Sequence, residues 1–352
     1  MNRSHNPAVL RRAVPFVSLC LLLILSVSAT SRDLRSGNPS REGISAERLQ
    51  RITDHMNARV DKGIMVGGQG VIARNGRVVY NKTYGMADRE QARLMEEDAI
   101  YRIYSMTKPI TAVALMMLYE EGHFFLNDPV AMYIPELGDL KVAVSTADSQ
   151  AGAVSDGTTS TGGGVGDENQ TGLTRAPLRQ PTIRDLLRHT AGFTYGIFGD
   201  TEVDKLYREA KLFEAKDLEE FVTILGTLPL QYEPGSRWHY SVSVDVQGRL
   251  VEAISGMSFG EFLRQRIFEP LEMHDTSFVL PAEKLDRLTQ IYAPEGTKVG
   301  YDGAWQRSRS QKLEVADARV SEGYLERGKF ESGGGGLLST SNDYMRFSLM
   351  ML

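Results

Sequence analysis

Apolar residues recur at helical spacing in several separate stretches of this chain. In residues 45–60, four apolar residues from Leu49 to Val60 lie three or four positions apart, which places them on one face of a helix. Ser45 precedes this run, and its hydroxyl can accept a backbone N–H of the first turn. The same pattern predicts further helices within Pro181–Gly192, across Val246–Ile254, from Ser258 (in a capping box with Glu261) to before Pro270, and over Tyr344–Leu352.

Two strand-like runs follow the first predicted helix. Residues 66–72 and 77–84 carry valine, isoleucine and tyrosine residues that favour strands. The dipeptide Asn75-Gly76 between them suits the positive φ angles of a tight hairpin turn, so we expect two antiparallel strands. The order of helix, hairpin, connection and helix predicts an α/β fold of the α+β kind, with helices flanking an antiparallel sheet.

The segment Tyr101–Leu118 sets Ser105 and Lys108 three residues apart at the start of an apolar helix. Pro109 fits there, because proline is tolerated only near the first turn of a helix. Side chains three residues apart face the same way, so the hydroxyl and the amine can meet where unpaired backbone N–H groups add positive potential. This pair could form a nucleophile site. The alternative is that Ser105 only caps a core helix and Lys108 points to water.

Tyr240 is a second candidate, because it lies where the turn Glu233–Ser241 enters the helix that contains Val246. Its phenol could reach across a cleft and, with Lys108, take the Ser105 proton and return it to a leaving group. Lysine and tyrosine titrate near about 10, so a base that works near neutral pH needs a pKa lower by roughly 3. The alternative for Tyr240 is an aromatic anchor in the core.

The histidines are given no catalytic or metal-binding role. His239 adjoins Tyr240 and suggests a Ser-His triad, but no acidic residue that would orient it can be assigned from the sequence. His189, at the end of the predicted helix after Pro181, is interpreted as structural. The six histidines show no metal-ligand spacing, so neither a metal nor another cofactor is expected.

Composition adds constraints on location and partners. Residues 1–29 have the features of an export signal, with Arg11 and Arg12 ahead of an apolar run and a small-residue cleavage site, so we expect a periplasmic or secreted protein without a stable membrane span after cleavage. Cys20, the only cysteine, lies in this signal, which excludes disulfides and thiol catalysis from the mature chain. The net charge of −5 and the lack of a basic block argue against nucleic-acid binding.

The predicted domain organisation is a signal at 1–29 followed by one domain at 45–352 with an insertion. Residues 145–175 are almost entirely small or polar and cannot bury enough apolar surface to order themselves. We expect a flexible surface insertion there, and a substrate lid is the alternative. The oligomeric state is not indicated by any pattern in the chain.

Five segments follow one another in an order that is specific to one family: Ser105-Met106-Thr107-Lys108-Pro109, Pro181–Gly192, Pro234 through Ser241, Pro270 through Phe278, and Ser332–Asp343. Together they closely resemble the serine β-lactamase-related hydrolases, the group that holds class C β-lactamases, D,D-peptidases and family VIII carboxylesterases. The resemblance covers residues 45–352. It implies a β-lactamase/transpeptidase-like fold in which the site lies between a helical lobe and an α/β lobe with an antiparallel sheet.

What the resemblance implies for chemistry is acyl transfer through serine. Ser105 would be the acylated nucleophile, Lys108 its proton partner and Tyr240 the acid/base residue, with the Ser105 backbone N–H as one oxyanion donor. The implied function is an exported serine hydrolase of small carboxylic esters. The alternatives are a β-lactamase or D,D-peptidase acting on lactams or cell-wall peptides, and a non-catalytic relative that binds cell-wall peptides or a partner.

Two departures from the family pattern bear on function. The lactamase form of the second motif is Tyr-x-Asn, whereas the third position here is Val242, which favours ester over lactam substrates. The third motif, a Lys/His/Trp-x-Gly segment after the glycine run 333–336, is not found before Leu352, so we expect the chain to be incomplete at its C-terminus. Lys298 does begin a Lys-x-Gly, but it precedes the glycine run and is interpreted as a chance match in a polar loop.

Overall fold

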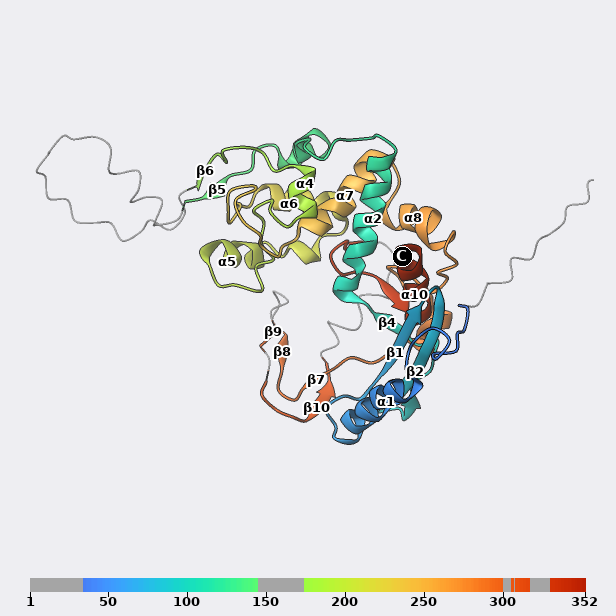
Figure 1. Cartoon of the computed structure of the whole chain (residues 1–352). Coiled ribbons are helices and arrows are strands. Elements are labelled where there is room, and N and C mark those ends of the chain that lie inside the picture. Colours follow the sequence, from blue (N-terminus) through green and yellow to red (C-terminus); the bar gives the residue numbers. More distant parts are fainter. Residues whose placement is uncertain (1–33, 145–173, 300–304, 307, 317–329) are drawn as a thin grey trace, which may run out of the picture. The chain divides into compact units, whose positions relative to one another are not determined.

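The structure is a computed structural model that describes residues 34–144, 174–299, 305–306, 308–316 and 330–352 (Figure 1). The predicted export signal at 1–29 and most of the predicted insertion at 145–175 lie outside the described residues. The last two residues of that insertion form β6 (Thr174–Arg175), which pairs antiparallel with β5 (Val142–Ala143). The predicted flexible segment was therefore too long at its C-terminal end, because these two residues have backbone partners.

The predicted hairpin forms with the predicted turn. Strand β1 (Gly67–Arg74) pairs antiparallel with β2 (Arg77–Asp88), which also pairs with the short β3 (Arg93–Leu94). Between β1 and β2, Asn75 and Gly76 have φ angles of 52° and 71°. Positive φ at both central residues matches the twist of the flanking strands, which explains why this dipeptide closes the hairpin.

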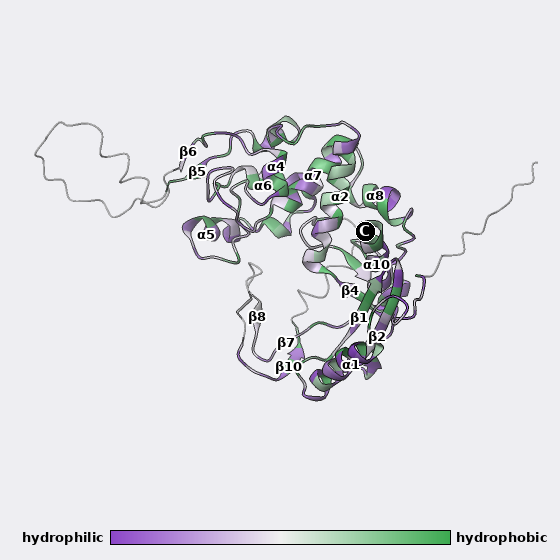
Figure 2. Ribbon diagram, in the orientation of Figure 1, coloured by the Kyte–Doolittle hydropathy of each residue, from purple (hydrophilic) through white to green (hydrophobic). Residues whose placement is uncertain are grey.

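Helix α1 (Ala46–Asp61) lies against this hairpin (Figure 1). Ser45 begins it as predicted, because its Oγ accepts a first-turn N–H at 3.2 Å. Figure 2 shows hydrophilic and hydrophobic residues on different sides of α1. The buried side chain of Leu49 packs with Tyr80 and Tyr84 of β2, so the helix covers the sheet with its apolar face.

The main hydrophobic core surrounds two helices, α2 (Thr107–Glu120) and α7 (Ser243–Ser255), which pack against each other (Figure 1). Leu115 of α2 and Leu250 of α7 are fully buried in this core. Each such side chain stabilises the fold by roughly 1.5–3 kcal/mol through burial. Three further helices pack against α7, namely α4 (Ile183–Leu187), α6 (Leu218–Gly226) and α8 (Phe259–Leu263), and α5 spans Glu202–Glu209.

The last described segment returns to the beginning of the Ser105 region. Strand β11 (Leu338–Thr340) pairs antiparallel with β4 (Ile100–Arg102), and α10 (Ser341–Met350) follows at once. This helix begins earlier than the apolar pattern predicted, because Thr340 Oγ1 accepts the Asp343 N–H at 3.1 Å and sets its first turn. The strand pairing brings the glycine run before β11 next to the residues around Ser105.

Three predicted details differ in the structure. Ser258 Oγ caps α8 by accepting the Glu261 N–H at 3.3 Å, but the Glu261 carboxylate binds Arg264, so only the serine half of the predicted capping box forms among the described contacts. Lys298, predicted to lie in a polar loop, is in β8 (Lys298–Val299), which pairs with β9 (Trp305–Gln306). The predicted strand entry at Asp275–Phe278 forms only an isolated bridge with β11, through Ser277. A π-helical segment, Arg264–Phe268, continues α8 toward Pro270, as the predicted helix did. The remaining elements are the paired strands β7 (Tyr292–Pro294) and β10 (Leu313–Val315) and the short 3₁₀ helices Val130–Met132, Pro135–Leu137, Leu212–Glu214 and Ala282–Arg287.

Candidate active site

Ser105 lies in a single 3₁₀ turn, Tyr104–Met106, that leads directly into α2. Pro109 is in the first turn of α2, as predicted, and Ser105 is exposed in the turn that immediately precedes the helix. Tyr104, just before the serine, has a φ of 42°. A left-handed conformation costs a non-glycine residue about 1 kcal/mol or more and occurs most often at functional sites.

The three residues predicted to act together are in contact. Lys108 Nζ donates a hydrogen bond to Ser105 Oγ at 3.1 Å, and Ser105 Oγ lies 2.8 Å from the phenol oxygen of Tyr240. Lys108 Nζ also lies 4.7 Å from the centre of the Tyr240 ring. An ammonium group in this position stabilises negative charge on either oxygen, so the arrangement can support proton transfer between the two hydroxyl groups.

Tyr240 fits both interpretations made from the sequence, each for a different part of the side chain. Its ring packs at centroid distances of 5.1 Å from His189, 5.1 Å from Tyr195 and 6.3 Å from Trp238. Its hydroxyl points out of this aromatic cluster to Ser105. The packing therefore holds the phenol oxygen in place next to the serine.

The glycine run forms one wall of the site and is attached to α2. The carbonyl oxygen of Gly334 accepts a hydrogen bond from Lys108 Nζ at 2.6 Å, and that of Gly333 accepts one from Thr111 Oγ1 at 2.8 Å. Lys108 and Thr111 are three apart on the same helix, so one face of α2 holds this segment. The Gly334 carbonyl directs the Lys108 amine, a contact that no sequence pattern predicts.

A cavity of about 310 Å³ opens beside Ser105. Most of its wall is aromatic or aliphatic, and several of these residues come from the region 195–213, where no sequence pattern marked a binding surface. Tyr195 and Phe213 are stacked with ring centroids 6.1 Å apart. The lining consists of Tyr104, Ser105, Tyr195, Ile197, Phe198, Phe213, Tyr240, Ser332 and Gly334 to Gly336.

The two nearby histidines face other partners. His239 Nε2 lies 3.3 Å from Thr194 Oγ1, and its ring packs against Tyr232. His189 Nδ1 lies 3.5 Å from Ser241 Oγ, and the His189 carbonyl accepts the His239 N–H at 2.8 Å. These contacts agree with a structural role for His189. In the described part of the chain, neither histidine forms a Ser-His triad with Ser105.

His189 should make the fold sensitive to acid. Burial, reinforced by the nearby Lys108, lowers the pKa of His189 to about 4, whereas histidine in an unfolded chain titrates near about 6.5. The unfolded state therefore binds more protons between these values, so this contribution to stability is complete above pH 6.5 and is lost as the pH falls toward 4. Because the side chain is partly exposed, we expect a loss of about 1–2 kcal/mol.

Urea unfolding at pH 7 and near pH 4.5, for the natural protein and for His189→Gln, measures this effect. The variant should lose less unfolding free energy over that interval, whatever its stability at pH 7. Equal pH dependence of the two proteins would show that His189 does not titrate as its surroundings require.

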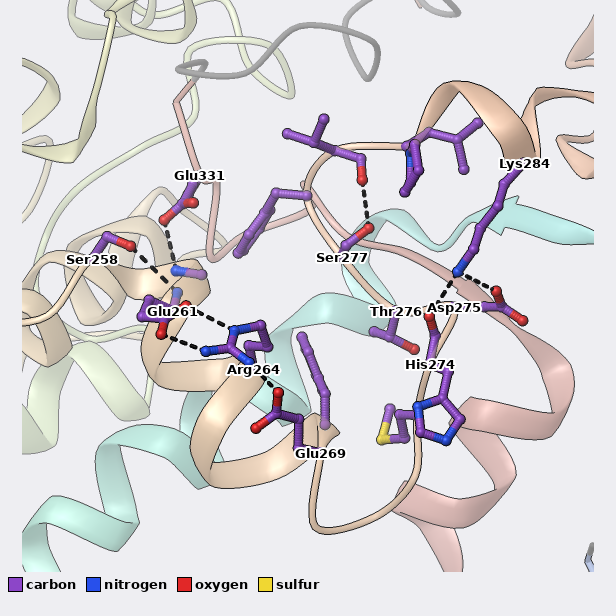
Figure 3. A pocket seen from close by; sticks show the side chains of 17 residues that line it. Ser258, Glu261, Arg264, Glu269, His274, Asp275, Thr276, Ser277, Lys284 and Glu331 are labelled. Atoms are coloured by element: carbon purple, nitrogen blue, oxygen red, sulfur yellow. Dashed lines mark hydrogen bonds and ion pairs between the residues drawn. The ribbon is translucent and has the colours of Figure 1, made fainter. Parts of the chain in front are cut away.

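A second, larger cavity of about 720 Å³ lies beside α8 and the turn that follows it (Figure 3). Several of its charged side chains are paired with one another, for example Arg264 with Glu261 and Lys284 with Asp275. Ser277 in this cavity donates its hydroxyl to a backbone carbonyl at 2.6 Å. The arrangement of serine, lysine and tyrosine at Ser105 is not repeated among the described residues that line this second cavity.

Membrane-spanning and metal-binding features were considered for the ranges that the structure describes. Within them no helix combines the length and apolar character needed to cross a membrane. No cluster of three or more histidine, cysteine, aspartate or glutamate side chains in the same ranges could hold a metal ion.

Several known proteins are similar to this chain in sequence or in fold. The chain is 29% identical over 292 residues to Protein Rv1367c of Mycobacterium tuberculosis, covering 83% of this chain and 63% of that protein. It is 28% identical over 292 residues to esterase EstB of Burkholderia gladioli, covering 80% of this chain and 64% of that esterase. The solved structure of "EstCE1, a hydrolase with promiscuous acyltransferase activity" is similar with a TM-score of 0.63 at 25% identity, over 86% of this chain and 70% of that chain.

The match extends over most of the domain predicted from the sequence. The chain spans 63–64% of the length of these two curated relatives. The structural similarity confirms the predicted β-lactamase/transpeptidase-like fold. The sequence profile described as Beta-lactamase matches residues 52–352, which include Ser105, Lys108 and Tyr240. This chain belongs to the beta-lactamase family.

Proposed function

We propose that this protein is a serine hydrolase that cleaves small, apolar carboxylic esters through an acyl-enzyme on Ser105. The observation that carries the proposal is the placement of Ser105 Oγ, 2.8 Å from the Tyr240 oxygen and 3.1 Å from Lys108 Nζ. A serine is a weak nucleophile unless a positioned group takes its proton, and this site has such a group within hydrogen-bond distance. The relatives named an esterase and a hydrolase support the same reaction class.

The proposed reaction has two steps. Ser105 Oγ bonds to the ester carbonyl carbon while its proton passes to Tyr240, which acts as a phenolate stabilised by the Lys108 ammonium. The bond to the alcohol oxygen then breaks, and Tyr240 returns the proton to the departing alcohol. Water repeats the attack on the acyl-enzyme, giving its proton to Tyr240 and then to Ser105, which releases the carboxylic acid. The backbone N–H of Ser105 is the proposed donor of a hydrogen bond to the developing oxyanion.

The cavity wall favours apolar substrates over charged ones. Phe198 and Phe213 flank Tyr195, with ring centroids 5.6 Å and 6.1 Å from the Tyr195 ring, so an acyl chain entering here would contact aromatic faces. Val242, which replaces the amide of the Tyr-x-Asn motif, is fully buried in the core. Both features support esters as substrates in place of acylamino lactams.

A comparison of substrates tests the proposal. We expect 4-nitrophenyl acetate, butyrate and hexanoate to be hydrolysed, the longer acyl chains with the lower KM, and a chromogenic cephalosporin to be hydrolysed far more slowly. Mass spectrometry of an acid-quenched reaction should find the acyl group on the peptide that contains Ser105. Rapid cephalosporin hydrolysis would indicate a β-lactamase, a stable penicillin adduct without ester turnover would indicate a D,D-peptidase, and no adduct would indicate a non-catalytic relative.

The cellular location is part of the proposal and rests on the sequence of residues 1–29. The charged start, apolar run and small-residue cleavage site of that segment support export, so the proposed enzyme would act in the periplasm or outside the cell. The proposed binding partner at Ser105 is a small-molecule ester, the substrate itself.

A further inference from the structure

Asp245 is a buried acid that the proposed reaction does not use. It lies in the first turn of α7, and its side chain is fully buried. One carboxylate oxygen, Oδ1, accepts hydrogen bonds from Ser332 Oγ at 2.5 Å and from the Gly334 N–H at 3.0 Å. The other oxygen, Oδ2, has no hydrogen-bond partner among the described residues. Burying a carboxyl group has a large desolvation cost, so a buried aspartate with these two side-chain hydrogen bonds among the described residues is unusual for a residue without a function.

Both of these side-chain hydrogen bonds of Asp245 come from the segment 332–334, which also binds the Lys108 amine. Gly334 is hydrogen-bonded on both sides of its Cα: its N–H donates to Asp245, and its carbonyl accepts from Lys108 Nζ at 2.6 Å. Lys108 Nζ in turn donates to Ser105 Oγ. A continuous series of contacts therefore leads from α7, through one glycine, to the amine and hydroxyl at the start of α2.

The backbone at Gly334 is pressed against Asp245. A Cβ atom at this position would lie 2.6 Å from Asp245 Oδ2 and 2.8 Å from the Tyr195 hydroxyl, closer than a Cβ atom can approach. Only glycine permits this approach. Ser332, two residues earlier, is held by the same carboxylate oxygen, so the segment 332–334 is attached to α7 at two points.

We propose that Asp245 is a positioning residue: by accepting hydrogen bonds from Ser332 and Gly334, it holds the Gly334 carbonyl where that oxygen directs the Lys108 amine toward Ser105. The inference rests on the proposed function of Ser105 and deepens it. The role requires a hydrogen-bond acceptor of this shape and does not require a negative charge. Burial raises the pKa of Asp245, although the two hydrogen bonds and Lys108 act against this, so a neutral acceptor is compatible with the surroundings.

Three variants separate positioning from a general contribution to folding. Asp245→Ala removes the acceptor, and Asp245→Asn keeps an oxygen of the same geometry while removing the charge. Glu252→Ala is the matched control, because Glu252 lies on the same helix and also accepts a backbone N–H, from Phe259 at 3.1 Å, but does not contact the glycine segment.

The rate of Ser105 acylation by a 4-nitrophenyl ester and hydrogen exchange of the peptide covering residues 330–340 are measured for each protein. Asp245→Ala should lower the acylation rate by about 100-fold with little change in KM, since a displacement near 1 Å has an effect of this order, and should lose exchange protection in that peptide. Asp245→Asn should restore most of both properties. Glu252→Ala should retain both.

Two results would overturn the positioning role. Asp245→Ala with unchanged acylation and unchanged protection would show that the contacts to Ser332 and Gly334 are dispensable. If Asp245→Asn is as impaired as Asp245→Ala, the site requires the negative charge of Asp245, which contradicts the proposed role as a hydrogen-bond acceptor. If the natural protein forms no acyl-enzyme, the proposed function fails, and the exchange of residues 330–340 still decides whether Asp245 fixes the segment.

Discussion

Ser105→Ala should abolish ester hydrolysis, with kcat lower by about 10⁴-fold or more, because the acyl-enzyme route needs this oxygen and the loss of a serine nucleophile has effects of that order or larger. Ser105 is exposed, and within the described part of the chain its hydroxyl is hydrogen-bonded to Lys108 and Tyr240. The substitution removes one oxygen atom and creates no buried cavity. We therefore expect the midpoint of thermal unfolding to stay close to that of the natural protein.

Ser277→Ala is the matched control for this prediction. Ser277 also lines a cavity, and its hydroxyl donates to the Val279 carbonyl instead of to a lysine. Turnover of 4-nitrophenyl butyrate by the three proteins is the measurement. Substantial activity in Ser105→Ala, or a comparable loss in Ser277→Ala, would contradict the assignment of Ser105 as the nucleophile.

Tyr240→Phe should lower kcat by about 10²–10⁴-fold, the usual contribution of general acid–base catalysis. The variant keeps the aromatic ring, which stacks on Trp238 at 6.3 Å and contacts His189 and Tyr195. It loses only the oxygen that lies 2.8 Å from Ser105 Oγ. The expected cost to folding is therefore about 1 kcal/mol or less, that of one partly exposed hydrogen bond.

A second tyrosine provides the comparison for Tyr240→Phe. Tyr133→Phe removes a hydroxyl that donates to Asp128 at 2.9 Å and does not line the Ser105 cavity. Stopped-flow measurement of acylation, with unfolding free energies for both variants, separates chemistry from stability. If Tyr240→Phe acylates at the natural rate, another group takes the Ser105 proton and the proposed role of Tyr240 is wrong.

The fold was predictable wherever neighbouring residues decide the structure. Asn75-Gly76 closes the hairpin through its own φ angles, and Ser45 begins α1 through its own hydroxyl. Predictions failed where a distant or competing partner decided, as for Glu261, whose carboxylate binds Arg264 instead of completing the capping box. Lys298 was assigned to a loop because its two-residue strand depends on a pairing partner that no local pattern reveals.

The pairing of Ser105 with Lys108 could be predicted from the chain alone, because two residues three apart at the start of a helix face the same way. Tyr240 was a candidate from its place where a turn enters a helix, and the resemblance to a family gave it a role. That Tyr240 meets Ser105, a contact across 135 residues, became visible in the folded protein, because it depends on the packing of α2 against α7. The Gly334 carbonyl, Asp245 and the aromatic cavity wall likewise required the folded chain, because backbone contacts and packing between distant segments leave no periodic signal in the sequence.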